Sequence, residues 1–416
     1  KDYNAFIDVV SLYPASMGHN NYPVGQCFKM NAEEAKKINM NEIPIGIYNI
    51  DYKANRSLLH APCGFKDPKT KSLSWNLEDR ENIYRTSVDI ENMLQRGYTV
   101  KINHGWYWKS SAPIFKEYIE ELYKIKEKAE KDSPEYTLAK LWMNGLYGKM
   151  IQRPIYEKTE IITCNAEYWR FWGSHEITDI TEIDDSRWSI SGIARLGSEQ
   201  KKCITKPTQL GAFILAYSRR IMMNYMIESN PREDLEDDWQ YTDTDSFCVP
   251  ARCAQRIKRY NGGTLGDIDD DCGHGAKILK AVYIAPKLYE IWYALPAGSK
   301  MKGGKIAEEH KVYRKFAAKG LEKRDLTSEK FEVMALGGVV TTTKAFTFKK
   351  IGLNRNSKQE NIPQFSVVMA KAGYSDIETK ALTREANKTS WKGRHFNGNS
   401  SVPHGHHSIE NMETSL

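Results

Sequence analysis

The stretch YTDTDSFCV, residues 241–249, is the segment from which the fold can be predicted. Asp243 and Asp245 stand ahead of an apolar run from Phe247 to Val249. This order predicts a β-hairpin with carboxylates at its tip, and an extended backbone would project both carboxylates from one face. The alternative is that an isolated Asp-x-Asp only supplies turn residues, because Asp is common in hairpin loops.

A second acidic segment, DVVSLYP at residues 8–14, follows the apolar run that begins at Ala5. Its β-branched residues predict a buried strand that ends near Pro14 and carries Asp8. Mg²⁺ prefers oxygen ligands and is usually held by one or two carboxylates plus substrate phosphates. A pair of cations about 3.5–4 Å apart, bridged by shared carboxylates, is the arrangement that phosphoryl transfer to a 3′ hydroxyl requires.

A third segment, KLWMNGLYG at residues 140–148, is typical of a helix that contacts a nucleotide. Ser133 as cap and Pro134 as first helical residue predict where this helix begins, so residues 113–149 form an antiparallel helical hairpin. Lys140 and Tyr147 are two turns apart on one face, and could contact a triphosphate and a base.

Three further side chains could complete such a nucleotide site. Tyr13 would lie under the sugar, where its ring can exclude a 2′ hydroxyl, although an ordinary core tyrosine is the alternative. Lys124 and Lys128 share a face of the preceding helix and could contact phosphates, or could simply form a solvated surface.

Composition is compatible with this chemistry. The chain has 416 residues, 40% of them hydrophobic, which favours several subdomains. The net charge of the whole chain is +7. The segment from Lys300 to Lys350 has 13 basic and 6 acidic residues, so its own net charge is also +7 and it is the candidate for contacting phosphate backbones. Scattered single cysteines favour a reducing compartment, and we expect a cytoplasmic protein, in the host cytoplasm if viral, without a membrane span.

Taken together, these segments resemble the motifs of family B DNA polymerases, and more narrowly those of the protein-primed branch of phages and linear plasmids. Residues 8–14, 140–148 and 241–246 are similar to motifs A, B and C of that family. Thr208-Gln209-Leu210-Gly211-Ala212 resembles its Tx2G[RA] element, and Lys287-Leu288-Tyr289 its KxY element. The resemblance covers about residues 1–350 and implies an α+β, right-hand polymerase fold of palm, fingers and thumb with two insertions.

The resemblance also implies where the subdomains begin and end. They are palm at 1–20, a first insertion for the priming protein at 21–112, fingers at 113–149, a second insertion for processivity and strand displacement at 150–205, palm at 206–294, a basic thumb at 295–353 and a flexible polar tail at 354–416. The chain begins without Met, so we expect it to be the downstream part of a longer polypeptide.

Residue roles follow from the same likeness. Asp8 and Asp245 are implied as principal metal ligands with Val9 beside them, and Asp243 as an auxiliary catalytic carboxylate. The implied nucleotide contacts are Ser11, Leu12, Tyr13, Lys140, Asn144 and Tyr147. The implied DNA contacts are Thr208, Gly211, Ala212, Lys287, Tyr289 and Lys319. The implied cofactor is a pair of Mg²⁺ ions, with Mn²⁺ as a substitute. The implied partners of a monomeric enzyme are primer-template DNA, dNTPs and a terminal priming protein.

Two departures from the family pattern bear on function. Gly145 replaces the Ser that usually follows Asn in motif B, which affects nucleotide selection. Family members normally carry a 3′–5′ exonuclease ahead of motif A, and the few residues before Asp8 do not supply its Asp-x-Glu strand, so we expect proofreading to lie in sequence outside this chain or to be absent. An inactive polymerase relative that only binds nucleic acid or a priming protein is the alternative. A reverse transcriptase is disfavoured, because those enzymes carry Tyr-x-Asp-Asp and lack the KxxxNxxYG helix.

Overall fold

A computed structural model describes most of the chain. The described residues are 3–67, 73–131, 133–152, 157–195, 206–285, 287–299, 306–318, 323, 326–336, 338, 340–345, 376–380, 390–391, 394–397 and 400–409.

An antiparallel sheet built from both halves of the chain forms the centre of the molecule. Its strand order is β11-β12-β1-β14-β15-β16, and β13 also pairs with β1. The strands are β1 (Asn4–Val9), β11 (Tyr241–Asp243), β12 (Ser246–Pro250), β13 (Ile268–Asp270), β14 (Lys277–Ala285), β15 (Leu288–Ala294) and β16 (Val312–Ala318). Because β1 pairs with β12, the two acidic segments predicted from the sequence lie on adjacent strands.

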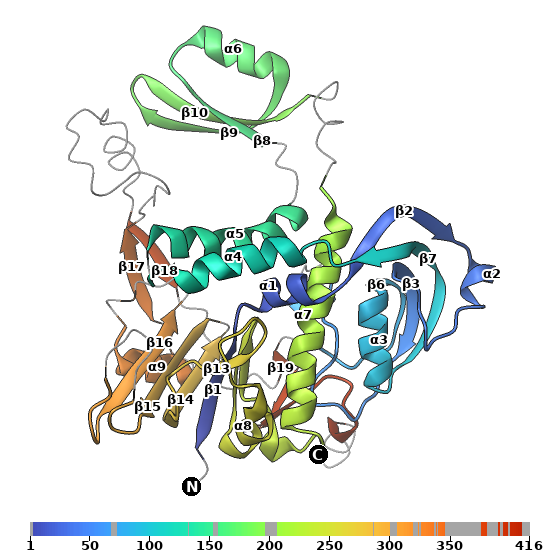
Figure 1. Cartoon of the computed structure of the whole chain (residues 1–416). Helices are drawn as coiled ribbons and strands as arrows, with labels where there is room; N and C mark the ends of the chain where they lie inside the picture. The colour runs from blue at the N-terminus through green and yellow to red at the C-terminus, as the bar shows by residue number, and fades with distance from the viewer. Residues whose placement is uncertain are drawn as a thin grey trace.

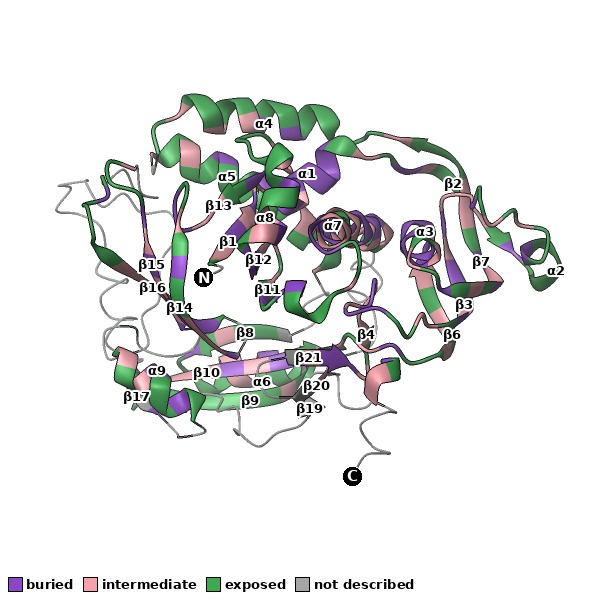
Figure 2. Cartoon of the chain, turned by 90° about the horizontal axis from the view of Figure 1, so that it is seen from below, coloured by how far each residue is buried: buried purple, intermediate pink, exposed green. Residues whose placement is uncertain are grey.

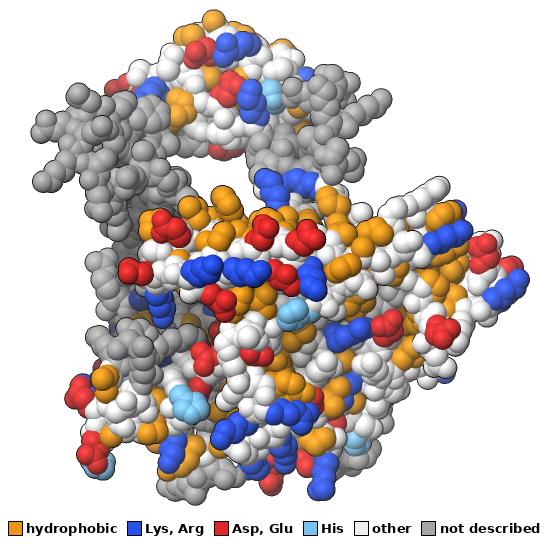
Figure 3. Space-filling model, viewed as in Figure 1, with side chains coloured by type: hydrophobic (Ala, Val, Ile, Leu, Met, Phe, Trp, Pro, Cys, Tyr) orange, Lys and Arg blue, Asp and Glu red, His pale blue; other side chains and the backbone are white. Residues whose placement is uncertain are grey.

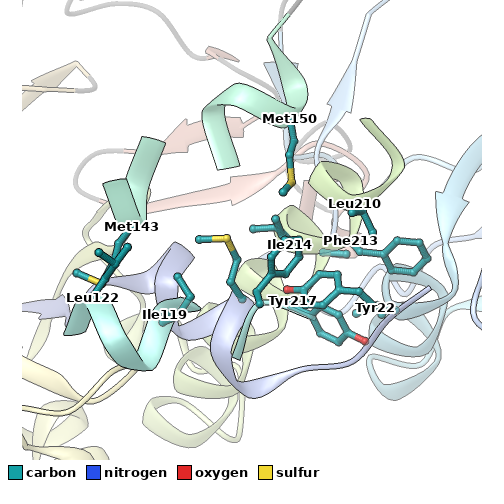
Figure 4. Close-up of a cluster of buried hydrophobic side chains, with 13 residues drawn as sticks. Tyr22, Ile119, Leu122, Met143, Met150, Leu210, Phe213, Ile214 and Tyr217 are labelled. Atoms are coloured by element: carbon teal, nitrogen blue, oxygen red, sulfur yellow. The ribbon is translucent and has the colours of Figure 1, made fainter. Parts of the chain in front are cut away.

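Four helices meet beside this sheet around one apolar cluster. They are α1 (Leu12–His19), α4 (Lys116–Lys128), α5 (Pro134–Ile151) and α7 (Thr208–Ser229), and α8 (Ala251–Ile257) packs on the lower part of α7 (Figure 1). Phe213 and Ile214 of α7, Ile119 of α4 and Met143 of α5 are all fully buried in this cluster (Figure 4). Figure 2 shows α1 and α7 largely buried, whereas the outer faces of α4 and α5 are exposed.

The helical hairpin forms where the sequence predicts it. The Ser133 side chain accepts a hydrogen bond from the backbone N–H of Tyr136, and Pro134 is the first helical residue of α5. These local interactions satisfy amide groups that have no partner within the helix, so they fix where α5 begins.

Segment 8–14 differs from its prediction as a strand that continues to Pro14. β1 ends at Val9, Ser11 adopts a left-handed conformation with φ 53° and ψ 60°, and α1 begins at Leu12. Pro14 is tolerated because it lies in the first turn, where its missing N–H removes no helical hydrogen bond. Tyr13 therefore projects from a helix.

The first insertion is a four-stranded sheet with one main helix. The sheet order is β2-β7-β3-β6. The elements are β2 (Tyr22–Met30), α2 (Ala32–Ala35), β3 (Gly46–Lys53), β4 (Phe65–Lys66), β5 (Leu73–Ser74), β6 (Arg80–Thr86), α3 (Ser87–Gln95) and β7 (Thr99–Ala112). Helix α3 joins the insertion to α7 through the buried pair of Asp89 and Arg219, in which two guanidinium nitrogens donate to the two carboxylate oxygens at 2.9 Å.

The second insertion consists of a three-stranded antiparallel sheet and one helix. Its sheet order is β8-β10-β9, and its elements are β8 (Glu157–Ile162), α6 (Asn165–Ser174), β9 (His175–Asp184) and β10 (Arg187–Ala194). Helix α6 lies on the face of this sheet that points away from α5 (Figures 1 and 2).

The remaining elements are η2 (Leu235–Asp237), η3 (Lys258–Tyr260), α9 (Ser328–Ala335), β17 (Thr341–Ala345), β18 (Asp376–Lys380), β19 (Ser390–Trp391), β20 (Arg394–Asn397) and β21 (Ser400–Pro403). Of these, η2 precedes β11, η3 lies between α8 and β13, and the others come after β16. No helix among the described residues is long and apolar enough to span a membrane.

Residues 394–397 and 400–409 make contacts with the body of the molecule, although the sequence predicts a flexible tail over 354–416. The Arg394 guanidinium donates to the carbonyl of Leu59 at 2.8 Å and lies 3.4 Å from an Asp238 carboxylate oxygen. The backbone N–H of Leu77 donates to the carbonyl of His404 at 2.7 Å. Polar contacts with the first insertion and with the segment before β11 therefore hold this part of the tail against the molecule. The flexibility of the tail as a whole stays a prediction.

Candidate active site

The two principal carboxylates lie on neighbouring segments of the central sheet. Asp8, the penultimate residue of β1, pairs in register with Ser246, the first residue of β12. The backbone N–H of Val9 donates to the carbonyl oxygen of Asp245 at 2.7 Å. Residues far apart in sequence thus become hydrogen-bonded neighbours, as the sequence pattern predicts.

The Asp243–Asp245 segment is a hairpin tip, but it is not extended. β11 ends at Asp243, Thr244 has φ 63°, and β12 begins at Ser246. The left-handed Thr244 makes a tight turn, so the two aspartates do not project as alternate residues of one strand. Asp243 points to the same side as Ser246 and Asp8, since cross-strand partners share a face.

Lysine and tyrosine of the KxY element contact this hairpin. Lys287, with φ 60°, places its Nζ 3.7 Å from an Asp243 carboxylate oxygen, and its backbone N–H donates to the Tyr241 hydroxyl at 3.0 Å. The Tyr289 ring is almost fully buried, with its centroid 5.1 Å from that of Tyr241 and 5.5 Å from that of Phe6. Its ring therefore supports the hairpin from within the core.

The sequence analysis did not identify three further carboxylates near Asp8 and Asp245. Asp269 on β13 is the cross-strand partner of Asp8, so both side chains project from the same face. Burial raises the pKa of Asp245, and the negative charges of Asp243 and Asp271 raise it further. Burial likewise raises the pKa of Asp270 to about 7. The three consecutive aspartates Asp269-Asp270-Asp271 could have indicated these carboxylates from the sequence.

This donor set fits a divalent cation. Within the described ranges, no group of three His, Cys, Asp or Glu side chains already converges on one point as a closed metal cage. However, Mg²⁺ usually keeps several waters and takes only one or two protein carboxylates. Asp8 and Asp245 supply such oxygens. Burial and then the charges of Asp243 and Asp271 raise the pKa of Asp245, and a bound cation would favour its charged form.

Two aromatic rings close over the space beside these carboxylates. Tyr13 of α1 and Tyr147 of α5 stack with centroids 4.4 Å apart and planes 14° apart. Burial raises the pKa of Tyr13, and the charge of Asp245 raises it further, which places the ring near the acidic site. The structure thus joins the tyrosines of motifs A and B.

A lysine that was not predicted faces this space. The Lys126 ammonium on α4 donates to the Ser11 hydroxyl at 3.3 Å. Burial lowers the pKa of Lys126, and the nearby charge of Lys140 lowers it further, so the two lysines form a local positive cluster. Lys124 and Lys128, the lysines considered from sequence, are exposed, in agreement with a solvated surface. The signal for Lys126 was weak because its contact depends on how α4 packs on α1.

The other predicted nucleotide contacts are placed as follows. Lys140 and Asn144 are exposed on α5, and the Asn144 amide donates to the Lys140 carbonyl at 2.9 Å. Gly145 and Gly148 have open space where a side chain would lie. Leu12 turns its side chain into the core, with 3% of its surface exposed, which leaves its backbone for a ligand.

The Tx2G[RA] element forms the first turn of α7. Thr208 is exposed and Ala212 is half-buried. Gly211 is buried, and a Cβ at this position would lie 2.1 Å from the Ile151 side chain, so glycine allows α7 to approach the end of α5. Lys319, the predicted thumb contact with DNA, lies outside the described residues.

The fold and this acidic, aromatic and basic arrangement define a polymerase-like class of protein, and comparison identifies the family. Residues 2–231 match the family described as DNA polymerase type B, organellar and viral. Because the match covers more than half of the chain, the chain belongs to this family. The family B prediction from the sequence is confirmed.

Curated relatives carry names of the same kind. A probable DNA polymerase of Neurospora intermedia is 30% identical over 249 residues, which cover 58% of this chain and 24% of that protein. A DNA polymerase of Kluyveromyces lactis is 28% identical over 261 residues, covering 58% of this chain and 23% of that protein. The chain thus spans about a quarter of the length of these relatives.

Solved structures of Phi29 DNA polymerase share the fold. One orthorhombic crystal form has a TM-score of 0.57 at 20% identity, covering 80% of this chain and 53% of that chain. A complex of the same polymerase with primer-template DNA and incoming nucleotide has a TM-score of 0.58 at 18% identity, covering 83% and 56%. This likeness confirms the predicted α+β polymerase fold.

Proposed function

We propose that this chain carries the polymerisation module of a DNA-templated DNA polymerase that extends a primer 3′ end with dNTPs. The observation that supports this most directly is that Asp8 of β1 lies next to Asp245, in the turn just ahead of the neighbouring strand β12, beside the stacked pair of Tyr13 and Tyr147. In this reaction the 3′ hydroxyl attacks the α-phosphate in line and pyrophosphate leaves.

Asp8 and Asp245 would hold two Mg²⁺ ions, with the Val9 backbone beside them. When bound, the ions would acidify the 3′ hydroxyl and neutralise the leaving pyrophosphate. The chain's own contribution is to hold the carboxylates on a rigid sheet, with Asp243 kept close by Lys287. Rigid placement of this kind supplies orientation before the reaction starts.

The nucleotide site would lie between α1, α4 and α5. Lys126 and Lys140 would contact the triphosphate, and the exposed glycine face of α5 would admit the base. Since the rings of Tyr13 and Tyr147 are in van der Waals contact, they would separate for a base pair to enter, and Tyr13 would then lie against the sugar.

Exchange of Tyr13 tests its role as a sugar gate. Tyr13→Val is expected to raise the incorporation of ribonucleotides relative to deoxynucleotides by roughly tenfold to a hundredfold, because the ring no longer excludes the 2′ hydroxyl. Tyr13→Phe keeps the ring and is the matched control. Selectivity would be measured as the ratio of kcat/KM for dNTP and rNTP on one primer-template, and equal ratios in all three proteins would show that Tyr13 is only a packing residue.

Exchange of Lys126 tests the proposed triphosphate contact. Lys126→Ala is expected to raise the KM for dNTP by roughly tenfold to a hundredfold, as for the loss of a charge-assisted hydrogen bond. Lys124→Ala, two residues away on the exposed side of the same helix, is the control and should leave KM within about twofold. Equal effects of both substitutions in single-nucleotide incorporation would contradict the assignment.

The proposed partners are primer-template DNA, dNTPs and a terminal priming protein received by the first insertion. Phi29 DNA polymerase has been captured with primer-template DNA and incoming nucleotides, which supports the first two. The second insertion would support processivity and strand displacement, and the basic segment around residues 300–350 would contact the DNA backbone. A monomeric state, a cytoplasmic location and the subdomain boundaries stay predictions.

Primer extension tests the proposed function as a whole. The chain would be given primed single-stranded DNA with Mg²⁺ and dNTPs, with parallel reactions that replace dNTPs by rNTPs or the DNA template by RNA. Extension confined to DNA template and dNTPs is the expected result. Retained binding of primer-template without any incorporation would favour the inactive binding module instead.

A further inference from the structure

The second insertion carries an exposed aromatic surface far from the carboxylates. Trp169 on α6 has 60% of its surface exposed, the largest fraction for any aromatic side chain in the described part of the chain, and Trp172 has 46%. Both lie on the outward side of α6, and Gly173 beside them has open space in place of a side chain. Exposed tryptophans are costly in water, so a gathered pair indicates a binding surface.

The arrangement of the two indoles is fixed. Trp169 and Trp172 meet edge to face with centroids 5.6 Å apart and planes 80° apart, and Tyr168 meets Trp169 in the same way at 5.1 Å. Beneath them, Phe171 is buried against Ile162 and Ile190. The helix therefore has a small core of its own, and Trp169 presents a ring face whose orientation is set before any ligand arrives.

A positive charge lies directly beside this ring pair. The Arg195 guanidinium lies over the Trp172 ring, 4.9 Å from its centroid, and donates to the Trp172 carbonyl at 3.2 Å. In the described part of the chain Arg195 has no ion-pair partner, so its charge is available to an anion. Arg170, also on α6, keeps its side chain largely exposed with Glu160 at 3.9 Å.

Charge is distributed unevenly over the insertion. Acidic side chains outnumber basic ones, but most of them lie in β9 or in the turn after it. They are Glu176, Asp179, Glu182, Asp184 and Asp185. Near α6, Glu160 is paired with Lys158 and Arg170, and Glu167 accepts from the backbone N–H and hydroxyl of Thr163. Acidic and basic side chains both appear on the part of this surface seen in Figure 3. The α6 side therefore combines aromatic rings with Arg195, which has no acidic partner among the residues that the structure describes.

We propose that Trp169, Trp172 and Arg195 form a binding surface for single-stranded DNA, separate from the catalytic carboxylates. A nucleobase would stack on the exposed face of Trp169, Trp172 would support that ring from its edge, and Arg195 would contact the adjacent phosphate. Stacking on aromatic rings next to a cation is how proteins bind single strands without reading their sequence, and every base offers a ring face. The site agrees with the proposed polymerase function but does not depend on it, because binding needs neither metal nor dNTP.

The test separates this surface from any DNA contact at the active site. The full chain would be irradiated with an oligothymidine of about twenty nucleotides that carries single 5-iodouracil bases, without metal or nucleotide, and the cross-linked peptides would be mapped. We expect a cross-link at Trp169. Cross-links confined to residues outside 157–195 would overturn the proposal.

Affinity measurements complete the test. Trp169→Ala is expected to weaken binding of the same fluorescein-labelled oligonucleotide about tenfold, while Trp169→Phe keeps most of the affinity. Arg195→Ala should weaken binding. It should also reduce the slope of log affinity against log salt concentration by about 1, as expected for the loss of one phosphate contact. Trp75→Ala, an exposed tryptophan of the first insertion, is the control. If Trp169→Ala binds like wild type, or if a duplex shows the same dependence on Trp169, the surface does not serve single-stranded DNA.

Because the assay contains no dNTP, it distinguishes failure of this proposal from failure of the polymerase proposal. A chain that cross-links at Trp169 but cannot extend a primer supports the DNA surface alone. A chain that extends primers with Trp169→Ala unchanged in oligonucleotide binding supports the polymerase alone.

Discussion

Asp245→Asn and Asp8→Asn are each expected to lower the rate of nucleotide incorporation by more than about a thousandfold. Loss of one charge-stabilising group typically costs about a hundredfold to a thousandfold. Here each asparagine would also remove the full negative charge of a carboxylate that we propose as a metal ligand. The two backbones are joined through Val9 and the Asp245 carbonyl, so neither substitution should disturb the strands themselves.

Two measurements make this expectation specific. Single-turnover incorporation on a primer-template would report the rate, and the Kd for the same DNA without metal would stay within a few-fold of wild type. Asp185→Asn, an exposed aspartate in the turn after β9, is the matched control. Near-normal incorporation by either active-site variant with Mg²⁺ would remove Asp8 and Asp245 from the mechanism.

Arg219→Met is expected to lower the free energy of unfolding by about 3–5 kcal/mol, because it leaves a buried carboxylate without its partner. Asp89 has only 3% of its side chain exposed and receives both guanidinium hydrogen bonds at 2.9 Å. The Thr86 hydroxyl, which also donates to Asp89, cannot neutralise its charge. Replacing both members, as Asp89→Leu with Arg219→Met, should recover much of this loss, since no unpaired charge then remains.

Urea unfolding followed by tryptophan fluorescence would rank these proteins. The neighbouring Arg220→Met is the control, because its partner Glu91 is 40% exposed and surface pairs contribute only about 0–1 kcal/mol. If Arg219→Met and the double variant unfold at the same urea concentration, the unpaired charge of Asp89 is not the cause of the lost stability. The first insertion would then be held to α7 mainly by apolar contacts.

Local features of this fold were predictable because short-range interactions set them. Adjacent residues determine the cap at Ser133 and the proline at the start of α5. The spacing of apolar residues along one helix determines the buried stripe of α7. The hairpin at Asp243–Asp245 was also predictable. Its tip is a tight turn at Thr244, however, and not the extended backbone that we expected. Its pairing with the Asp8 strand could be inferred from the chemistry that requires both.

Other features depend on contacts between distant segments. Asp269 faces Asp8 only because β13 pairs with β1 in one particular register, and a slip of one residue would turn it to the other side. Lys126 reaches Ser11 only because that residue adopts a left-handed conformation between β1 and α1. Hydrophobic periodicity places residues on a face of an element, but it does not say which other element that face meets.

The contacts of residues 394–397 and 400–409 affect where this chain can be shortened. Arg394 connects the carbonyl of Leu59 to Asp238, three residues ahead of β11, and His60 also contacts Asp238 at 2.5 Å. A protein ending after the basic segment would keep the His60–Asp238 contact but lose the Arg394 contacts that reinforce it, between the first insertion and the strand that leads to Asp243. Expression vectors that trim the C-terminus would therefore change the junction ahead of the acidic hairpin, and a purification tag is better attached at the N-terminus.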